Sequence, residues 1–352
     1  MASQHRAVII GCGGYARVHA QGYKRIPGCE LVAGADVAPE KAQAFAAELG
    51  TRWYTDWPEM LAKEKPALVS VTTTHCAHAP VTIGVAGAGM GVQGICVEKP
   101  IGMDLGEADE MIAACEAHGI TLAVGHQRRF NLEWLAGQEI IESGNIGQPQ
   151  LIVGRWPCQQ TAMFTYDLFG GGALPWLGSH TLDLMRMFCG DAKWVLAQVD
   201  LADPPADVEK RAYAHMEFEQ GVHGVLETGE GMNPDYYRGQ TITVYGTEGT
   251  VEMVDAVGTR WRSKAHPQWQ PVELDMEKVE GSKSNFWATY KLLDDMVQAI
   301  AQGREPVCSA ANGRAALELC LAIYQSDRLG CRIDLPLREK QSPLKLMVQQ
   351  RP

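Results

Sequence analysis

The chain has 352 residues, of which 46% are hydrophobic and 21% charged, and its formal net charge is −11. This length allows two domains with cores of their own, and the balance of residue types is that of a globular protein. The negative charge argues against double-stranded DNA or an anionic membrane surface as a partner, because both attract a positive protein face. It does not argue against a small anionic ligand in a local basic pocket.

The sequence contains no apolar run of the ~20 residues that a membrane helix needs. Residues 1–6 are polar and lead directly into an apolar strand, so no secretory signal is expected. The 10 cysteines are scattered without a CxxC pair, and several lie within apolar runs. We therefore predict a cytoplasmic protein with reduced, structural thiols. His and Cys residues nowhere have the spacing of a zinc site, and no metal ion is expected.

Short apolar strands alternate with amphipathic helices in the first third of the chain. The helix predicted over residues 39–49 is the clearest, because its apolar residues recur at helical spacing, with Pro39 at its start and Gly50 past its end. Strands are predicted at residues 7–10, 31–35, 67–71, 94–97 and 121–124, and a further helix at about 108–115. Continuous apolar strands that alternate with helices indicate a doubly wound parallel sheet, covered on both faces.

The pattern changes after about residue 145. Turn residues at 219–221 and 247–249 separate strands as in β-hairpins, which predicts an open, mainly antiparallel sheet. Its strands are expected at residues 151–155, 194–200, 212–218, 221–227 and 240–245, with helices to follow at 284–302 and 312–329. We predict an α/β protein with a Rossmann domain over residues 1–125, an α+β domain over residues 126–340 and a C-terminal tail over residues 341–352.

A glycine-rich turn follows the first predicted strand directly. It reads Gly-Cys-Gly-Gly-Tyr-Ala from Gly11, a GxGxxA pattern in which Gly11 permits a tight turn and Gly13 lets the backbone approach a pyrophosphate. The helix that follows would point its N-terminus at that pyrophosphate. Asp36 stands at the end of the second strand, 20 residues beyond Ala16, where it can bind a ribose. The pattern predicts a dinucleotide site; the alternative is an ordinary turn, with Asp36 as the cap of the helix that begins at Pro39.

Asp36 also predicts which nicotinamide dinucleotide binds. A carboxylate at this place accepts hydrogen bonds from both hydroxyls of the adenosine ribose, but it repels the 2′-phosphate of NADP. Two like charges ~4 Å apart at an effective dielectric constant near 20 repel each other by about 4 kcal/mol. NAD is therefore expected as the cofactor in preference to NADP.

Further stretches resemble the glucose–fructose oxidoreductase and inositol dehydrogenase family, Gfo/Idh/MocA. Residues 69–78 (VSVTTTHCAH) are similar to the strand and loop that border the nicotinamide ribose in that family. Residues 97–100 (VEKP) match its Glu-Lys-Pro motif. Residues 170–174 (GGGAL) and 178–183 (GSHTLD) resemble its glycine-rich entry to the helix that carries the catalytic histidine, and residues 124–130 (VGHQRRF) also fit.

The resemblance spans nearly the whole chain. It implies an NAD-dependent oxidoreductase with Lys99 and His180 as catalytic residues, and a second domain that binds a carbohydrate or polyol and assembles into a homodimer or homotetramer. The residues expected at the cofactor are Gly11, Cys12, Gly13, Gly14, Tyr15, Asp36, Thr72, Thr73, His75, Glu98, Lys99 and Arg128. The residues expected at the substrate are Trp176, Gln159, Gln160, Tyr236 and Tyr237, and each of the last four could equally lie in the core or at the surface.

Hydride transfer from an alcohol carbon needs a base for the hydroxyl proton and a positive charge beside the developing alkoxide. Lys99 stands at the carboxyl end of a predicted parallel strand, where doubly wound sheets bind their ligands. Histidine in general titrates near neutral pH, which suits His180 as a base. The alternatives are a solvated surface lysine and a histidine that only packs its helix onto the sheet.

Two positions depart from the family. Thr74 and His75 stand where the family usually has Pro-Asn, and Trp176 stands where an aspartate commonly lies four residues before the histidine. Asp183, three residues after His180, could orient the imidazole or could be the family's structural helix aspartate. We predict that Trp176 contacts the substrate and narrows the range of substrates; the alternative is that it fills a domain interface.

The leading interpretation is a dehydrogenase or reductase that acts on a secondary hydroxyl of a sugar, polyol or related ring. One alternative resembles the family's glycosidases, which hold NAD permanently, oxidise a sugar hydroxyl transiently, eliminate the aglycone and regenerate the cofactor. A second alternative is a non-catalytic NAD-binding regulator, and the presence of both Lys99 and His180 argues against it.

Overall fold

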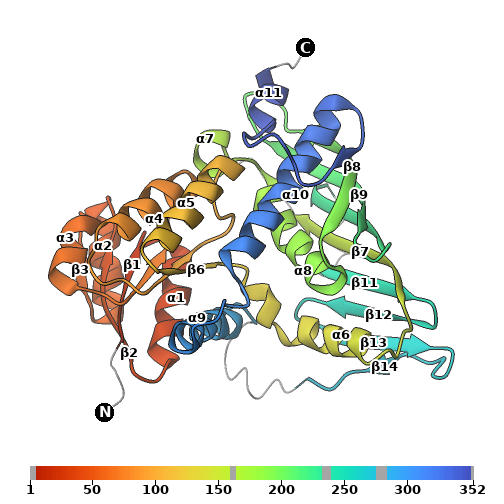
Figure 1. Cartoon of the computed structure of the whole chain (residues 1–352), viewed down its shortest axis with the longest axis horizontal. Helices are drawn as coiled ribbons and strands as arrows, with labels where there is room; N and C mark the ends of the chain where they lie inside the picture. The colour runs from red at the N-terminus through yellow and green to blue at the C-terminus, as the bar shows by residue number, and fades with distance from the viewer. Residues whose placement is uncertain (1–4, 159–163, 232–238, 275–283, 350–352) are drawn as a thin grey trace. The chain divides into compact units, whose positions relative to one another are not determined.

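The computed structural model describes residues 5–158, 164–231, 239–274 and 284–349 (Figure 1). The chain forms two compact units. The first comprises Met1–Gly102, Gly106–Phe130 and Ser282–Arg314, and the second comprises Met103–Leu105, Asn131–Gly281 and Ala315–Pro352. The segment 282–314 thus belongs to the first unit, although the predicted boundary at residue 125 would assign it to the second domain.

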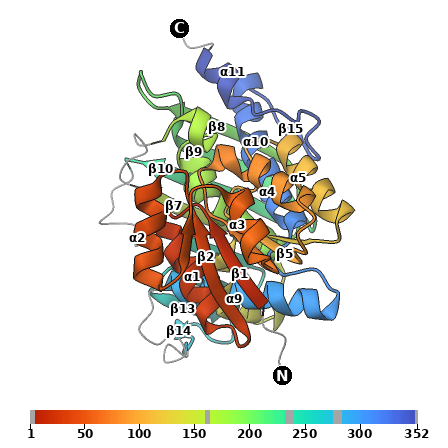
Figure 2. The same ribbon diagram turned by 90° about the vertical axis from the view of Figure 1, so that its left-hand side faces the viewer.

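The first unit is built on a parallel sheet with the strand order β3-β2-β1-β4-β5-β6, the order of a Rossmann fold. Its strands are β1 (His5–Ile10), β2 (Cys29–Ala35), β3 (Arg52–Tyr54), β4 (Leu68–Val71), β5 (Gly94–Val97) and β6 (Thr121–Val124). Figure 2 shows β1 and β2 side by side. Strands β4 and β5 are buried along their whole length, as their continuous apolar sequences indicate. The predicted Rossmann fold is confirmed.

Helices of the first unit follow from local sequence signals. They are α1 (Gly14–Arg25), α2 (Pro39–Leu49), α3 (Trp57–Glu64), α4 (His78–Gly87), α5 (Leu105–Ala117) and α9 (Ser284–Gln302), with a short 3₁₀ turn η1 (His75–Ala77) before α4 and another, η2 (Gln127–Phe130), after β6. Helix α2 has the predicted bounds, because Pro39 begins it and Gly50 ends it with a left-handed φ of 71°.

Helix α9 comes late in the sequence but packs against α1 (Figures 1 and 2). Gly22 of α1 allows the close approach, because a Cβ there would stand 2.8 Å from Leu293 Cδ1. Tyr23 of α1 and Met296 of α9 are fully buried in the same apolar core. The core of the Rossmann unit is therefore completed by a helix that begins at Ser284, whereas the last strand of its sheet ends at Val124.

The second unit is built on a mixed sheet with the order β14-β13-β12-β11-β7-β10-β9-β8-β15 among the described residues. Its strands are β7 (Pro149–Cys158), β8 (Ala192–Leu201), β9 (Glu209–Phe218), β10 (His223–Glu230), β11 (Thr241–Gly246), β12 (Gly249–Val254), β13 (Gly258–Ser263), β14 (Gln270–Pro271) and β15 (Ile333–Asp334). The pair β7 and β10 is parallel, and the other recorded pairs are antiparallel. The predicted α+β domain with an open, mainly antiparallel sheet is confirmed.

One face of this sheet is covered by helices. The helices of the second unit are α6 (Leu132–Glu142), α7 (Tyr166–Phe169), α8 (Ser179–Cys189), α10 (Ala310–Leu329) and α11 (Leu344–Gln349), with a π-helical turn η3 (Leu174–Gly178) before α8. Figure 1 shows α6 and α8 on the same side of the sheet. Gly154 of β7 lets α8 approach, because a Cβ there would stand 2.5 Å from Thr181 Cγ2. Helix α11 lies within the predicted C-terminal tail.

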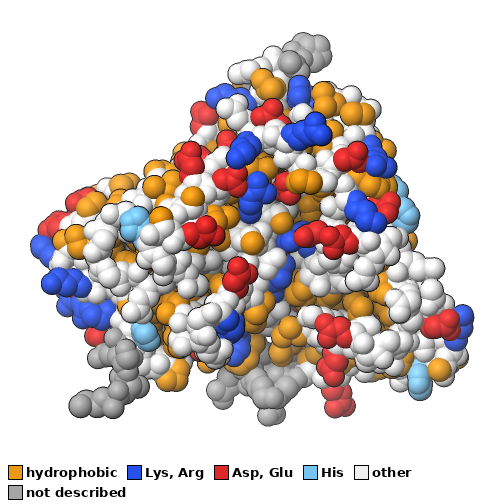
Figure 3. Space-filling view, viewed as in Figure 1, with side chains coloured by type: hydrophobic (Ala, Val, Ile, Leu, Met, Phe, Trp, Pro, Cys, Tyr) orange, Lys and Arg blue, Asp and Glu red, His pale blue; other side chains and the backbone are white. Residues whose placement is uncertain are grey.

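The described helices include none that is both long enough and apolar enough to cross a membrane. On the face drawn in Figure 3, acidic and basic side chains are interspersed rather than gathered by sign. Such a mixed surface gives no large field of one sign on that face.

Candidate active site

The glycine-rich turn is shaped by the close approach of β1 to β4. Gly11 has a φ of +92°, and a Cβ on it would stand 2.8 Å from the backbone carbonyl of Thr72 and the backbone nitrogen of Thr73. The Thr72 hydroxyl donates a hydrogen bond of 2.6 Å to the Gly11 carbonyl oxygen. Only glycine fits here, because any side chain would collide with the backbone that follows β4.

Gly13 and Gly14 lack a side chain for a different reason. An ideal Cβ on either residue has no protein atom within 4 Å. Gly13 is also the N-cap of α1, and no side chain caps that helix end. The first amide N–H groups of α1 have no partner within the helix, and the open space beside the two glycines leaves room for an anion to bind them. This arrangement fits the pyrophosphate of a dinucleotide, which needs both the open space and the donors.

Asp36 holds the turn and the end of β2 together. Its Oδ2 accepts the Cys12 amide at 2.8 Å, and its Oδ1 accepts the Ala38 amide at 2.9 Å. Each carboxylate oxygen keeps a second lone pair, so the group can still accept from two ribose hydroxyls. The next residue, Val37, is 91% exposed and uncharged. The Asp36 carboxylate thus bonds both the glycine-rich turn and the chain just before α2, while its contact with a ribose stays a prediction.

Lys99 is the second residue after β5 and is half-buried. Glu98, just before it, is buried and accepts from the Lys99 amide at 3.3 Å through Oε2. Its Oε1 lies 2.9 Å from His19 Nε2 of α1. His19 Nδ1 lies 2.9 Å from Ser70 Oγ, which bonds the Tyr23 hydroxyl at 2.8 Å. The Glu98 carboxylate thus belongs to a buried polar network.

The remaining cofactor candidates lie along the same edge of the sheet. Thr72 is buried, and Thr73 and His75 are half-buried in the loop between β4 and α4. Arg128 is buried in η2, where its neighbour Gln127 donates to the Tyr15 hydroxyl. Burial raises the pKa of the Tyr15 phenol above its usual value, and the nearby Glu98 charge adds to the shift. Tyr15 is therefore neutral and acts as a hydrogen-bonding group.

In the second unit, the loop 170–174 is held by a buried carboxylate. Glu209 Oε2 accepts the Gly172 amide at 2.9 Å, and its Oε1 accepts the Leu174 amide at 2.7 Å. A Cβ on Gly172 would collide with the Glu209 carbonyl, and one on Gly171 would stand 2.5 Å from the Tyr324 hydroxyl. These contacts explain why the loop is rich in glycine.

His180 lies in the first turn of α8 and is 5% exposed. Its ring centroid is 5.8 Å from that of Trp156 on β7. Asp183 is buried one turn later, and its Oδ1 lies 3.9 Å from Arg186. The contact with Arg186 fits a structural role for Asp183 on its helix, one of the two roles considered from the sequence.

Trp176 lies in the π-helical turn before α8 and is half-buried. Its ring centroid is 4.8 Å from that of Phe164, which in turn packs edge-on against Phe169 at 5.1 Å. The indole therefore belongs to an aromatic cluster of the second unit, while part of it stays accessible. The predicted contact of Trp176 with substrate stays a prediction.

The other four predicted substrate residues lie outside the described residues: Gln159, Gln160, Tyr236 and Tyr237. Within the described ranges, no group of three or more His, Cys, Asp or Glu side chains is arranged to hold a metal ion. Sequence reasoning missed the structural roles of His19, Ser70, His78 and Glu209, although Ser70 and His78 lie within residues 69–78, the stretch that resembles the family. Their roles come from hydrogen bonds that no local sequence pattern shows.

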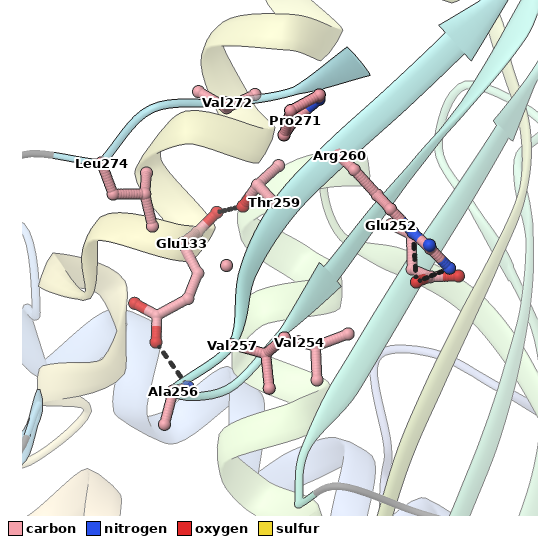
Figure 4. A pocket seen from close by; sticks show the side chains of 11 residues that line it. Glu133, Glu252, Val254, Ala256, Val257, Thr259, Arg260, Pro271, Val272 and Leu274 are labelled. Carbon is pink, nitrogen blue, oxygen red and sulfur yellow. Dashed lines mark hydrogen bonds and ion pairs between the residues drawn. The ribbon is translucent and has the colours of Figure 1, made fainter. Parts of the chain in front are cut away.

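A pocket of about 760 Å³ lies in the second unit beside α6 (Figure 4). Glu133 reaches from α6 and accepts the Ala256 amide at 2.9 Å. Across the pocket, Arg260 and Glu252 form an ion pair of 2.7 Å. None of the described lining residues is a candidate site residue, so the reaction is not assigned to this pocket.

Comparison with known proteins agrees with both units. The model described as "Oxidoreductase family, NAD-binding Rossmann fold" matches residues 5–126, and the model described as "GFO/IDH/MocA C-terminal domain" matches residues 134–252. The fold and the glycine-rich turn therefore define an NAD-dependent oxidoreductase. The chain belongs to the GFO/IDH/MocA family, and the resemblance read from its motifs is confirmed.

Relatives and solved structures cover almost the whole chain. D-apiose dehydrogenase from Paraburkholderia graminis is 27% identical over 96% of this chain and 92% of its own length. The scyllo-inositol 2-dehydrogenase (NAD(+)) of Bacillus subtilis is 24% identical over 96% of this chain and 98% of its own length. The structure of levoglucosan dehydrogenase with NADH and levoglucosan has a TM-score of 0.85 at 22% identity, and the match covers 95% of this chain and all of that one (100%).

The first prediction concerns cofactor choice. The unmodified protein is expected to bind NAD more tightly than NADP in titrations of both. Asp36→Asn keeps a hydrogen-bond acceptor but removes the charge, so it is expected to narrow the preference for NAD by tenfold or more, since repulsion of a 2′-phosphate is worth up to about 4 kcal/mol. Glu40→Gln, on the exposed start of α2, is the control and should leave the preference unchanged. Equal affinities in the unmodified protein would show that Asp36 does not face the ribose.

The second prediction concerns Glu209. Burial raises the pKa of this carboxyl above its usual value. Because the folded pKa is the higher one, the stability that the group contributes is complete below the usual carboxyl pKa of about 4.3 and is lost as the pH rises through the folded pKa. The melting temperature of the unmodified protein should therefore fall relative to Glu209→Gln as the pH is raised from acid to neutral.

Exposed Glu219 supplies the control, because Glu219→Gln removes a carboxylate from the same unit without removing a buried one. The unmodified protein and Glu219→Gln should show parallel melting temperatures over the same pH range. A pH-independent difference between the unmodified protein and Glu209→Gln would contradict the raised pKa.

Proposed function

We propose that the protein transfers a hydride between NAD and the carbon that bears a secondary hydroxyl of a sugar, polyol or related ring. The observation that carries this proposal is the glycine-rich turn with its open helix end and Asp36, in a chain whose two units both match the family. The substrate class is supported by the names of the relatives, which are dehydrogenases of D-apiose and scyllo-inositol.

The proposed reaction assigns proton transfer to Lys99 and His180. When bound, NAD supplies the hydride acceptor at its nicotinamide ring. A hydride leaves an alcohol carbon readily only as the hydroxyl proton is removed, so a base and a nearby positive charge are needed. Lys99 follows β5 at the carboxyl edge of the parallel sheet, where its ammonium group would stabilise an alkoxide. His180 is held in α8 as the second proton-transfer group.

We also propose that the protein works in the cytoplasm as a homodimer or homotetramer. The described cysteines form no disulfide bond with one another, which suits a reducing compartment. On the sheet of the second unit, Leu196, Tyr213 and Tyr245 are 46%, 37% and 43% exposed. Large apolar side chains on a sheet are a surface that a second copy of the chain could cover.

The third prediction tests the reaction itself. With NAD and a panel of D-apiose, scyllo-inositol and levoglucosan, reduced nicotinamide should accumulate in stoichiometric amounts for at least one compound. Lys99→Ala and His180→Ala should each lower kcat by ~10²–10⁴, the usual effect of removing an acid–base group. Lys41→Ala and His118→Ala, which remove exposed side chains from α2 and from the turn after α5, are the controls.

The same assay distinguishes a dehydrogenase from the two alternative functions, the glycosidase and the regulator. Turnover of a glycoside without accumulation of reduced nicotinamide would favour the transient-oxidation glycosidase. Tight NAD binding with no turnover of sugars, polyols or glycosides would favour the regulator. A loss of less than about tenfold in either variant would remove that residue from the mechanism.

The fourth prediction concerns Trp176. Trp176→Ala is expected to change KM and the order of preference within the panel, with a smaller loss of stability than the ~3–5 kcal/mol of a core Trp truncation, because the indole is only half-buried. Trp261→Ala on β13, also half-buried and packed on His266, is the matched control and should leave the preference unchanged. A full core-type loss of stability with unchanged preference would show that Trp176 only fills its aromatic cluster.

A further inference from the structure

A buried histidine joins two loops at the cofactor edge of the first unit. His78 is the first residue of α4 and is fully buried. Its Nδ1 lies 2.8 Å from the Pro100 carbonyl oxygen, and its Nε2 lies 3.3 Å from the Thr73 carbonyl oxygen. One imidazole thus spans the loop after β4 and the segment after β5.

These two loops are neighbours because β4 and β5 are adjacent parallel strands that end together, with Val71 beside Val97. Thr73 belongs to the loop assigned to the cofactor, and Pro100 directly follows Lys99. The contacts of His78 therefore tie the main chain at the proposed catalytic lysine to the proposed cofactor loop.

The chemistry of the ring decides which contact is the stronger. Both partners are carbonyl oxygens, which only accept hydrogen bonds, and a neutral imidazole has one N–H to donate. The 2.8 Å contact to Pro100 has the length of an ordinary N–H···O bond, whereas the contact to Thr73 is long. Burial lowers the pKa of His78, so the ring is neutral and its proton lies on Nδ1, toward Pro100.

The residue before Lys99 is fixed in a similar way. Glu98 is held by His19 at 2.9 Å, and it accepts the Lys99 amide. Buried histidines thus act on both sides of Lys99: His78 from α4 bonds the Pro100 carbonyl directly, and His19 from α1 bonds the Glu98 carboxylate that accepts the Lys99 amide.

We propose that His78 is a positioning residue, which fixes the main chain at Lys99 and Pro100 against the Thr73 loop and so sets the place of the Lys99 ammonium group. This inference rests on the proposed function, in which Lys99 takes part in proton transfer. It assigns to His78 no contact with the reacting atoms.

Three substitutions of His78 test its hydrogen bonds to Pro100 and to Thr73 one at a time. His78→Asn keeps an amide N–H near the position of Nδ1 and so keeps the bond to Pro100. His78→Gln moves the amide N–H toward the position of Nε2 and favours Thr73. His78→Leu removes both donors at similar volume. Thr82→Ala is the matched control, because Thr82 lies one turn further along α4 and is equally buried.

The first readout is amide hydrogen exchange of the NAD-saturated protein over residues 98–103. His78→Leu and His78→Gln are expected to speed exchange there by about fivefold, the factor that corresponds to one net hydrogen bond of about 1 kcal/mol. His78→Asn and Thr82→Ala should leave it within about twofold of the unmodified protein. Equal exchange in all four variants would overturn the proposed anchor.

The second readout is kinetic, with the compound of the D-apiose, scyllo-inositol and levoglucosan panel that is oxidised fastest. His78→Leu should lower kcat ~10–100-fold, as small misplacements of a reacting group do, while the Kd of NAD changes by less than about threefold. His78→Asn should restore most of kcat, and His78→Gln should not. If Lys99→Ala lowers kcat but His78→Leu has the same kcat as Thr82→Ala, the role of His78 is wrong while that of Lys99 stands. If Lys99→Ala does not change kcat, the proposed role of Lys99 itself is wrong.

Discussion

The nucleotide-binding edge of the first unit depends on how closely β1 and β4 approach each other where they end. At Gly11 there is no room for a side chain, because a Cβ would stand 2.8 Å from the Thr72 carbonyl. The chain turns there with a positive φ, which glycine adopts readily, and after this turn Gly13 lies at the N-terminus of α1. The amide groups of that helix end are left open for an anion. A single steric limit between two strands thus places the phosphate-binding backbone.

The second constraint is a buried polar network behind the same edge. A carboxylate in a protein interior is costly unless it is hydrogen-bonded, and Glu98 meets this need with His19 and the Lys99 amide. His19 is in turn bonded to Ser70 of β4. Because α1, β4 and the end of β5 all contribute, the network holds the segment that carries Lys99 against α1, the helix whose N-terminus is proposed to bind the pyrophosphate.

Sequence predicted those features whose causes are local. Helix α2 was found to the residue because Pro39 and Gly50 act within one turn of its ends, and the glycine-rich turn was found because its whole pattern lies in consecutive residues between a strand and a helix. Periodicity gave the bounds of α9 but could not show that its apolar face completes the Rossmann core, since an amphipathic helix does not specify its partner. The bond between His19 and Glu98 joins residues 79 apart, which no local pattern reveals. The parallel pairing of β7 with β10 was likewise hidden, because apolar alternation is the same for either strand direction.

In both units, a buried glutamate accepts backbone amides of the chain next to a proposed catalytic group. In the first, Glu98 accepts the amide of Lys99; in the second, Glu209 accepts the amides of Gly172 and Leu174, before the helix of His180. Bonds from amides to a carboxylate are stronger than those to a neutral acceptor, and burial protects them from competing water. Burying a charged carboxylate costs free energy because the charge loses its hydration, and this desolvation raises the pKa of the Glu209 carboxyl. Since these loops are shaped by groups that do not react, the side chains assigned to proton transfer do not have to hold their own loops in place.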